Sequence, residues 1–237
     1  MINTEHSSIN WLPGISVDCV VFAFYENRLK YLTLKFLNSD VWSLAGGYVG
    51  INESMNDAAK RVLEERTGLK DVFLEQYYCF GDIGRNLHAR AEFEKIRSDM
   101  GAITNDLDWL TSRFITMGYL AVVEFEKVHV SLGNLSDQYM WQDVTEFQRL
   151  FLDHNEILDM ALVKLRECLD SKLIAFKLLP ETFTMSEVQQ VYETILGTSI
   201  VRTNFQRKIL SLDILERIEK KYSGGAHKAP YLYRLKK

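Results

Sequence analysis

One segment of the chain carries charged side chains at spacings that suit metal-dependent chemistry on phosphates. The segment runs from Gly47 to Leu69 and reads GYVGINESMNDAAKRVLEERTGL. Arg61 and Glu65 are four residues apart and share one face of a predicted helix, and Glu53 precedes that helix in a loop. Carboxylates on such a helix could hold Mg²⁺, a hard cation that needs oxygen ligands, against a pyrophosphate. The metal would then neutralise charge on the phosphates during hydrolysis.

The spacing of this segment resembles the Nudix box. In that box a glycine and five residues precede a glutamate, and seven residues then precede the run Arg-Glu-aliphatic-any-Glu-Glu-any-Gly-aliphatic. The positions in register here are Gly47, Glu53, Arg61, Leu63, Glu65, Gly68 and Leu69. The resemblance implies that residues 1–172 form a Nudix-like α/β/α sandwich with a mixed sheet.

Two positions depart from the box, and both are positions of metal-binding glutamates. Val62 offers no ligand atom, and Arg66 would place a positive charge where the metal binds. A register slipped by one residue would make Glu64 and Glu65 the acidic pair, but it would move the glycines and the arginine of the box out of place. We therefore expect a degenerate box that serves as a scaffold or a ligand pocket, with no catalytic residue, no metal and no cofactor.

The surviving charged residues of the box suggest a structural role. In the family, the residues that correspond to Glu53, Arg61 and Glu65 mostly brace the loop against the helix. Substitute metal ligands would have to come from elsewhere, and the candidates are Asp57, Asp82 and Glu94, each interpreted here as a solvated surface carboxylate. Hydrolysis of a nucleoside diphosphate derivative such as ADP-ribose remains the alternative function.

Apolar periodicity along the first 172 residues predicts a mixed α/β domain. Strands are predicted at residues 17–25, 29–36, 42–49, 72–80, 114–125 and 140–144, and helices at 56–67, 89–100 and 155–169, the first helix ended by Gly68. Residues 82–113 form an inserted segment so long that it should have structure or function of its own. Its candidate effector contacts are Asp82, Arg85, Asn86 and His88.

The last part of the chain, residues 173–237, has the order of a winged helix-turn-helix domain. A helix is predicted at residues 186–196, capped by Thr184 or Ser186 and ended by Gly197, and a second helix at 203–212. The stretch 214–222 follows, then the glycine-containing tip Ser223-Gly224-Gly225, then the aromatic and basic end at 230–237. This order predicts a DNA-binding domain.

The charge distribution agrees with that division. The net charge of −4 taken over the whole chain argues against nucleic acid as a partner. Residues 200–237, however, hold 10 Lys and Arg against 3 Asp and Glu, a net charge of +7, and the remainder holds 18 against 29, a net charge of −11. The basic end is therefore the part expected to bind double-stranded DNA.

The second helix of this domain is the predicted reader of DNA bases. Phe205, Ile209 and Leu212 are expected to face the core. The predicted DNA-binding residues are Arg202, Thr203, Asn204, Gln206, Arg207, Lys208, His227 and Lys228. Arg and Lys suit guanine edges and phosphates, Asn and Gln suit adenine, and the last two residues would lie on the wing near the backbone or a minor groove. The alternative is a solvated basic helix packed on its own domain.

A degenerate Nudix domain followed by a winged helix is similar to the Nudix-related transcriptional regulators, the NrtR-like family. The resemblance rests on residues 178–197 (LLPETFTMSEVQQVYETILG), on Asn204, Phe205, Arg207 and Lys208, and on Ala229, Leu232 and Tyr233. The box form RVL-x-E-x-TGL resembles that of the sugar-responsive branch of this family, typified by the arabinose regulator AraR, which implies a role in carbohydrate metabolism. Other branches of the family respond to ADP-ribose. The family implies a homodimeric repressor on a palindromic operator, released by a small effector.

Composition bounds the remaining possibilities. Cys19, Cys79 and Cys168 are odd in number and widely spaced, so we expect buried thiols rather than disulfides. The chain has no run of 18 apolar residues and no signal-like start, which predicts a cytoplasmic protein without a membrane partner. A binding protein that uses neither hydrolysis nor DNA is the third possibility.

Overall fold

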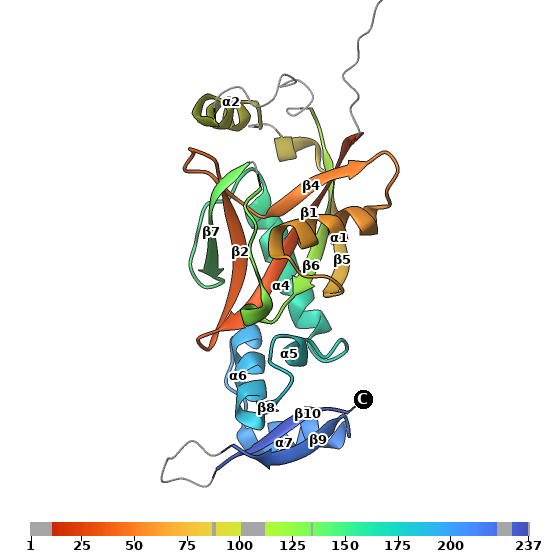
Figure 1. Ribbon diagram of the computed structural model, residues 1–237, viewed down its shortest axis with the longest axis vertical. Helices are drawn as coiled ribbons and strands as arrows, with labels where there is room; N and C mark the ends of the chain where they lie inside the picture. Colours follow the sequence, from red (N-terminus) through yellow and green to blue (C-terminus); the bar gives the residue numbers. More distant parts are fainter. Residues whose placement is uncertain (1–10, 87–88, 101–111, 134, 222–228, 237) are drawn as a thin grey trace, which may run out of the picture.

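The computed structural model describes residues 11–86, 89–100, 112–133, 135–221 and 229–236 (Figure 1). Within these residues, the first part of the chain forms a seven-stranded sheet. Its strands are β1 (Trp11–Tyr25), β2 (Arg28–Phe36), β3 (Trp42–Ser43), β4 (Ala45–Gly50), β5 (Phe73–Phe80), β6 (Ile115–Val122) and β7 (Ser136–Asp143). Its helices are α1 (Met55–Thr67), α2 (Ala89–Met100) and α4 (His154–Cys168), with short 3-10 turns η1 (Ile83–Asn86) and η2 (Phe125–Lys127).

The sheet is mixed, as the sequence predicts. Its central order is β3-β2-β1-β6-β5, and in addition β4 pairs with β1 and β7 pairs with β2. The pairing of β1 with β6 is parallel, and the other pairings are antiparallel. The predicted α/β class with a mixed sheet is therefore confirmed.

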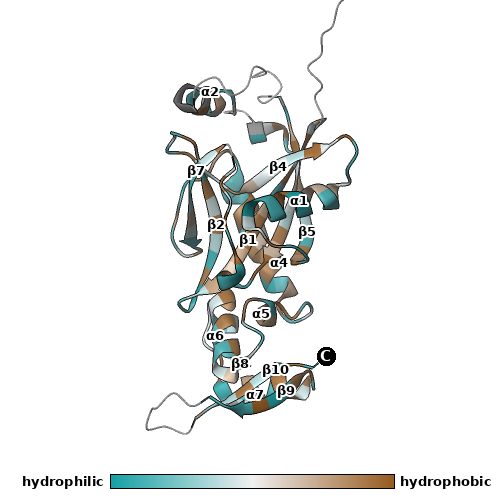
Figure 2. Ribbon diagram, in the orientation of Figure 1, coloured by the Kyte–Doolittle hydropathy of each residue, from teal (hydrophilic) through white to brown (hydrophobic). Residues whose placement is uncertain are grey.

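β1 is buried on both faces, which its continuous apolar sequence predicts. Val20 and Phe22 belong to the hydrophobic cluster that includes α4, whereas Cys19 and Val21 belong to the cluster that includes α1. Successive residues of a strand point to opposite faces, so α1 and α4 cover opposite sides of the sheet (Figures 1 and 2). The result is an α/β/α sandwich.

Most predicted elements of this domain are confirmed, and four strands differ in their bounds. The strand predicted at 17–25 begins earlier, at Trp11, and the strand predicted at 114–125 ends at Val122, before the 3-10 turn η2. The helices at 56–67, 89–100 and 155–169 are found within one residue, and Gly68 ends the first of them at a φ of 69°. The predicted strand at 42–49 is divided at Leu44, whose N–H donates to Nδ1 of His154 at 3.0 Å instead of continuing the ladder. The strand predicted at 140–144 begins earlier, at Ser136.

The second part of the chain has the element order of a winged helix. Its elements are α5 (Ile174–Lys177), β8 (Phe183–Thr184), α6 (Met185–Leu196), α7 (Arg202–Ser211), β9 (Leu215–Lys220) and β10 (Tyr231–Leu235). The three strands form a sheet in the order β8-β10-β9. Thr184 caps α6 in a capping box with Glu187, and Gly197 ends it at a φ of 69°, both at predicted positions. The short elements α5 and β8 were not predicted.

The two parts of the chain pack against each other through one hydrophobic cluster. That cluster joins Ile157 and Leu165 of α4 to Val188 of α6 and to Phe205 and Ile209 of α7. α6 also packs on β2 (Figure 1). The boundary between residues 172 and 173 remains a prediction.

The three cysteines differ in burial. Cys19 and Cys168 are buried, but Cys79 is exposed on β5, so the prediction of three buried thiols is wrong for one of them. β5 pairs with β6 alone and lies at the edge of the sheet, which leaves this side chain open to solvent.

Among the described residues, no helix is long and apolar enough to span a membrane.

Candidate functional site

The loop before α1 is fastened to that helix by an ion pair between Arg61 and Glu53. Nη2 of Arg61 lies 2.6 Å from Oε1 of Glu53, and Nε lies 3.0 Å from Oε2, so the pair is bidentate. Glu53 also accepts from the N–H of Gly50 at 2.7 Å, and Arg61 donates to the carbonyl of Tyr48 at 2.8 Å. The hydrogen bonds from Arg61 hold the pKa of Glu53 below its ordinary value.

Val62 of the box is part of the core between α1 and β4. Its side chain is 1% exposed. A Cβ added to Gly47 would lie 2.6 Å from Cγ2 of Val62, so the glycine of the box permits the close approach of β4 to α1. Val62, one of the two departures from the Nudix box, is therefore a packed aliphatic group that offers no ligand atom.

The side chain of Arg66 binds the loop of residues 128–133. Its Nη1 donates to the carbonyl of Leu132 at 2.9 Å and lies where a side chain on Gly133 would be. Burial lowers the pKa of this guanidinium group, and its Nε has no partner among the described residues. The guanidinium group of Arg66, which we expected at the metal position, is thus hydrogen-bonded to a neighbouring loop.

The candidate substitute ligands do not gather at the box. Asp57 accepts from the hydroxyl of Ser54 at 2.6 Å, Glu94 pairs with Arg90 at 3.0 Å, and Asp82 is exposed. Within the part of the chain that the structure describes, no three His, Cys, Asp or Glu side chains are grouped so that they could hold a metal ion. Glu65 is exposed and lies 3.4 Å from Nη1 of Arg61.

A buried polar group that the sequence analysis missed lies on the other face of β4. Asp18 accepts from the hydroxyl of Thr116 at 2.9 Å, and its other oxygen lies 3.6 Å from Nε2 of His154. Asp18 also occupies the space into which a side chain on Gly46 would project. An aspartate within the apolar run VDCVVFAFY was the signal that could have identified it.

The inserted segment is attached to the start of α4. Arg85 of η1 forms a two-point ion pair with Asp153, with Nε–Oδ2 at 2.6 Å and Nη2–Oδ1 at 2.9 Å. Glu92 of α2 accepts from Nη2 of Arg149 at 2.7 Å and from the N–H of Leu152 at 3.0 Å. Arg85, one candidate effector contact, therefore has a structural partner. The side chain of Asn86 and the whole of His88 lie outside the described residues.

α7 buries one face and presents the other to solvent. Phe205 and Ile209 are buried as predicted, but Leu212 is 45% exposed, because α7 ends at Ser211 and the chain turns away. The predicted DNA-binding residues Arg202, Thr203, Asn204, Arg207 and Lys208 are exposed, and Gln206 is half-buried. His227 and Lys228, together with Gly224 and Gly225, lie outside the described residues.

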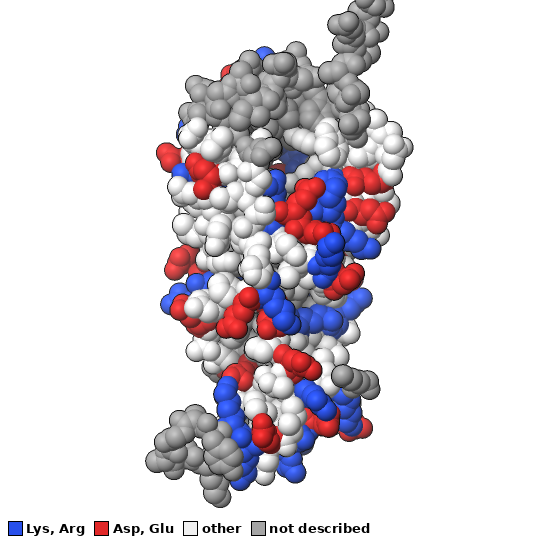
Figure 3. Space-filling view, viewed as in Figure 1, with Lys and Arg blue, Asp and Glu red and all other residues white. Residues whose placement is uncertain are grey.

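The cations of this domain fall into two groups. Four have carboxylate partners: Lys208 with Asp170, Lys221 with Glu187, Arg234 with Glu216 and Lys236 with Asp213. Among the described residues, the cations without a carboxylate partner are Lys177, Arg202, Arg207, Arg217 and Lys220, and Lys177 lies over the ring of Phe73. Arg207 donates to Oδ1 of Asn204 at 3.2 Å. Figure 3 shows Lys and Arg side chains on this end of the molecule, interspersed with Asp and Glu.

Arg217 and Lys220 on β9 are candidate contacts that the sequence analysis did not single out. Their charged groups lie 4.5 Å and 5.6 Å from the centre of the Tyr231 ring on β10. The register of β10 on β9 brings the three side chains together, and the sequence alone does not give that register. Cations stacked on an aromatic ring are held in place without losing their charge.

Fold and site together define a Nudix-like α/β domain joined to a winged helix. Residues 175–235 match the family described as NrtR DNA-binding winged helix domain. The chain is 25% identical over 229 residues to a protein of Acinetobacter baylyi named ADPR responsive transcriptional repressor NtrR, covering 94% of this chain and 82% of that protein. These matches support a relationship to the NrtR-like, Nudix-related winged-helix regulators.

Solved structures share the fold over nearly the whole chain. Shewanella oneidensis NrtR complexed with a 27mer DNA matches with a TM-score of 0.71 and 23% identity, covering 94% of this chain and 93% of that one. A MutT/nudix family protein from Enterococcus faecalis matches with a TM-score of 0.66 and 20% identity, covering 95% and 87%. At these identities the likeness establishes the fold of both parts.

Proposed function

We propose that this protein is a DNA-binding transcriptional repressor that leaves its operator when a small effector binds the Nudix-like domain. The observation that carries the proposal is the solvent-facing side of α7, where Thr203 and Arg207 lie opposite the buried Phe205 and Ile209. Arg202 and Arg207 keep their charge available for phosphates and base edges. The match of residues 175–235 to a DNA-binding domain supports this assignment.

The effector that we propose first is ADP-ribose. The Acinetobacter relative is named as responsive to this compound, whereas the box form RVL-x-E-x-TGL favours a pentose such as arabinose. A ligand that binds only the folded protein raises its melting temperature. A thermal-shift series with ADP-ribose, AMP, ribose and arabinose separates the two effector classes. A shift with arabinose and none with ADP-ribose would contradict the first choice and connect the protein to carbohydrate metabolism.

The Nudix-like domain is proposed to bind its ligand without hydrolysing it. Val62 is packed in the core and Arg66 is bonded to the loop at Leu132, so two of the family's ligand positions supply no oxygen. Incubation with ADP-ribose and Mg²⁺ should leave the compound intact. Turnover that is lost in Glu65→Gln would establish the hydrolase instead.

The operator is proposed to be a palindrome in the DNA upstream of the protein's own gene, bound by a homodimer in the cytoplasm. Binding to that DNA should weaken steeply as salt rises, because Lys and Arg contacts release counterions. Sedimentation of the complex gives the number of chains per duplex. ADP-ribose should lower the affinity, which requires that it bind the DNA-free form more tightly than the DNA-bound form. Equal affinity for operator and scrambled duplexes would contradict the proposed function.

A further inference from the structure

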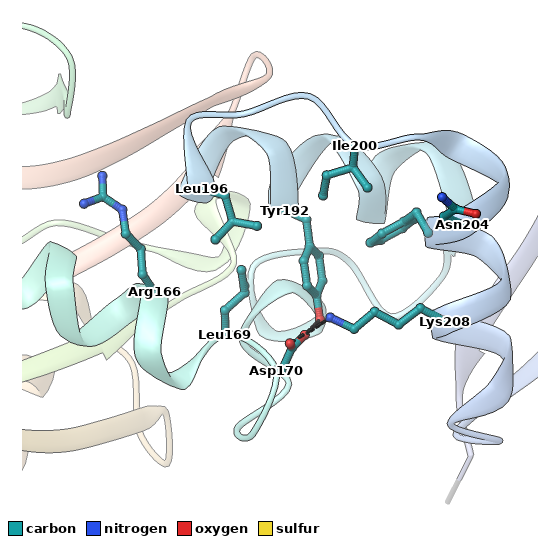
Figure 4. A pocket seen from close by; sticks show the side chains of 9 residues that line it. Arg166, Leu169, Asp170, Tyr192, Leu196, Ile200, Asn204 and Lys208 are labelled. Atoms are coloured by element: carbon teal, nitrogen blue, oxygen red, sulfur yellow. Dashed lines mark hydrogen bonds and ion pairs between the residues drawn. The ribbon is translucent and has the colours of Figure 1, made fainter.

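The Nudix-like domain makes a direct contact with α7 through Asp170 and Lys208. Nζ of Lys208 lies 2.7 Å from Oδ2 and 2.9 Å from Oδ1 of Asp170 (Figure 4). Asp170 follows the end of α4, whereas Lys208 is one of the residues predicted to bind DNA. A cation of the proposed DNA-reading helix is therefore bound by a carboxylate of the other domain.

Tyr192 of α6 holds Asp170 in this position. Its hydroxyl donates to Oδ1 of Asp170 at 3.0 Å, and its ring centre lies 5.6 Å from Nζ of Lys208. Burial, followed by the hydrogen bond to Asp170, raises the pKa of the Tyr192 hydroxyl, which therefore remains a donor at neutral pH. Tyr192 thus gives the carboxylate of Asp170 a second partner besides Lys208.

The contact can open without disrupting the core. A cavity of about 210 Å³ lies beside it, lined by Arg166, Leu169, Leu196, Ile200, Asn204 and Phe205 (Figure 4). The side chains of Lys208 and Asp170 are 51% and 61% exposed. Close-packed interiors resist rearrangement, but an exposed side chain beside a hollow does not have to displace packed neighbours. Lys208 can therefore swing away while Phe205 and Ile209 stay buried.

We propose that Asp170 is an interdomain latch, which binds Lys208 in the DNA-free protein and competes with a DNA phosphate for the same ammonium group. The inference rests on the proposed function. A lysine ammonium is a compact charge that binds carboxylate and phosphate oxygens alike, so the two partners exclude each other. The latch lowers the affinity for every DNA sequence, because a phosphate contact carries no base information.

α4 connects the inserted segment of the Nudix-like domain to the latch. The N-cap residue of α4, Asp153, is tied to the inserted segment by Arg85, and Asp170 follows the last turn of the helix. Near that end, Nε of Arg166 donates to the carbonyl of Ile195 in α6 at 3.0 Å. The end of α4 next to Asp170 is therefore in direct contact with the winged-helix part of the chain.

The test compares operator affinity and its salt dependence in four full-length proteins: wild type, Asp170→Asn, Lys208→Ala and the double variant. Asp170→Asn should bind operator and scrambled DNA about two- to fivefold more tightly, the range of an exposed ion pair. Its plot of log affinity against log salt should steepen by about one counterion. Both effects should vanish in the Lys208→Ala background. Melting temperatures show that each variant is folded.

Glu167→Gln is the matched control, because it removes the same charge from the same end of α4. Glu167 pairs with Lys164 at 3.8 Å and has no contact with α7 among the described residues. It should leave the salt slope unchanged. Equal affinity of Asp170→Asn and wild type, or a gain that persists without Lys208, would overturn the latch. Failure of the wild type to distinguish operator from scrambled DNA would instead contradict the proposed function.

Discussion

Arg85 and Asp153 join the inserted segment to the N-terminal end of α4 through a bidentate ion pair that is largely shielded from water. Their side chains are 6% and 10% exposed, and Nη1 of Arg85 also donates to the carbonyl of Phe114 at 2.9 Å. Residues 68 positions apart in the chain thus fix the segment on the sandwich. A buried pair of this kind is costly to break from one side, because the remaining charge stays without a partner.

Arg85→Ala should therefore lower the free energy of unfolding by about 3–5 kcal/mol. Denaturant titration measures the change, and the double variant with Asp153→Ala should recover part of it by removing the stranded carboxylate. Arg149→Ala is the control, since Arg149 is 76% exposed in its pair with Glu92 and should cost less than about 1 kcal/mol. Equal losses from the two arginine substitutions would contradict the structural role of Arg85.

Gly47→Ala should destabilise the protein because the new methyl group would lie 2.6 Å from Cγ2 of Val62. Overpacking of this kind typically costs about 1–3 kcal/mol. Val62→Ala makes room for the added methyl, so the double variant should be more stable than the sum of the two single losses implies. Chemical denaturation of the four proteins measures this coupling, and strict additivity would show that the two residues do not compete for space.

The Glu53–Arg61 pair predicts a loss of stability in acid. The pKa of Glu53 is lowered in the folded protein, so its contribution is complete above the unfolded value of about 4.3 and is lost as pH falls through the folded pKa. The difference in unfolding free energy between wild type and Glu53→Gln should thus be constant near neutrality and shrink below about pH 4.3. Glu65→Gln, at an exposed position, is the comparison variant. If the difference in unfolding free energy between wild type and Glu53→Gln grew as pH falls, the lowered pKa of Glu53 would be contradicted.

Local patterns predict the elements of this protein better than the contacts between them. Hydrophobic spacing and capping residues placed α1, α4, α6 and α7 within a residue or two, because those signals act within a few turns of chain. The two-residue strand β8 and the four-residue helix α5 are too short to show periodicity. The same patterns also predict which residues of a helix are buried and which strand is buried on both faces.

The site depends on contacts that no local pattern specifies. Arg85 meets Asp153 and Lys208 meets Asp170 because packing brings distant segments together. The sequence correctly placed Lys208 on an exposed helix face but did not show that a carboxylate of the other domain binds it. Tyr231 joins Arg217 only through the register of β10 on β9.

The cations without carboxylate partners on α7 and those on β9 should affect DNA binding differently. Arg207→Ala, on the solvent-facing side of α7, should cost about 1–3 kcal/mol and relax the preference at one base pair. Arg217→Ala, on the wing strand beside Tyr231, should weaken operator and scrambled duplexes equally and reduce the salt slope by about one. Lys70→Ala is the control, since Lys70 belongs to the Nudix-like domain, where it pairs with Glu64 at 3.0 Å. Fluorescence anisotropy across a salt series measures all three. A base preference lost with Arg217 but retained without Arg207 would exchange the roles assigned to α7 and the wing.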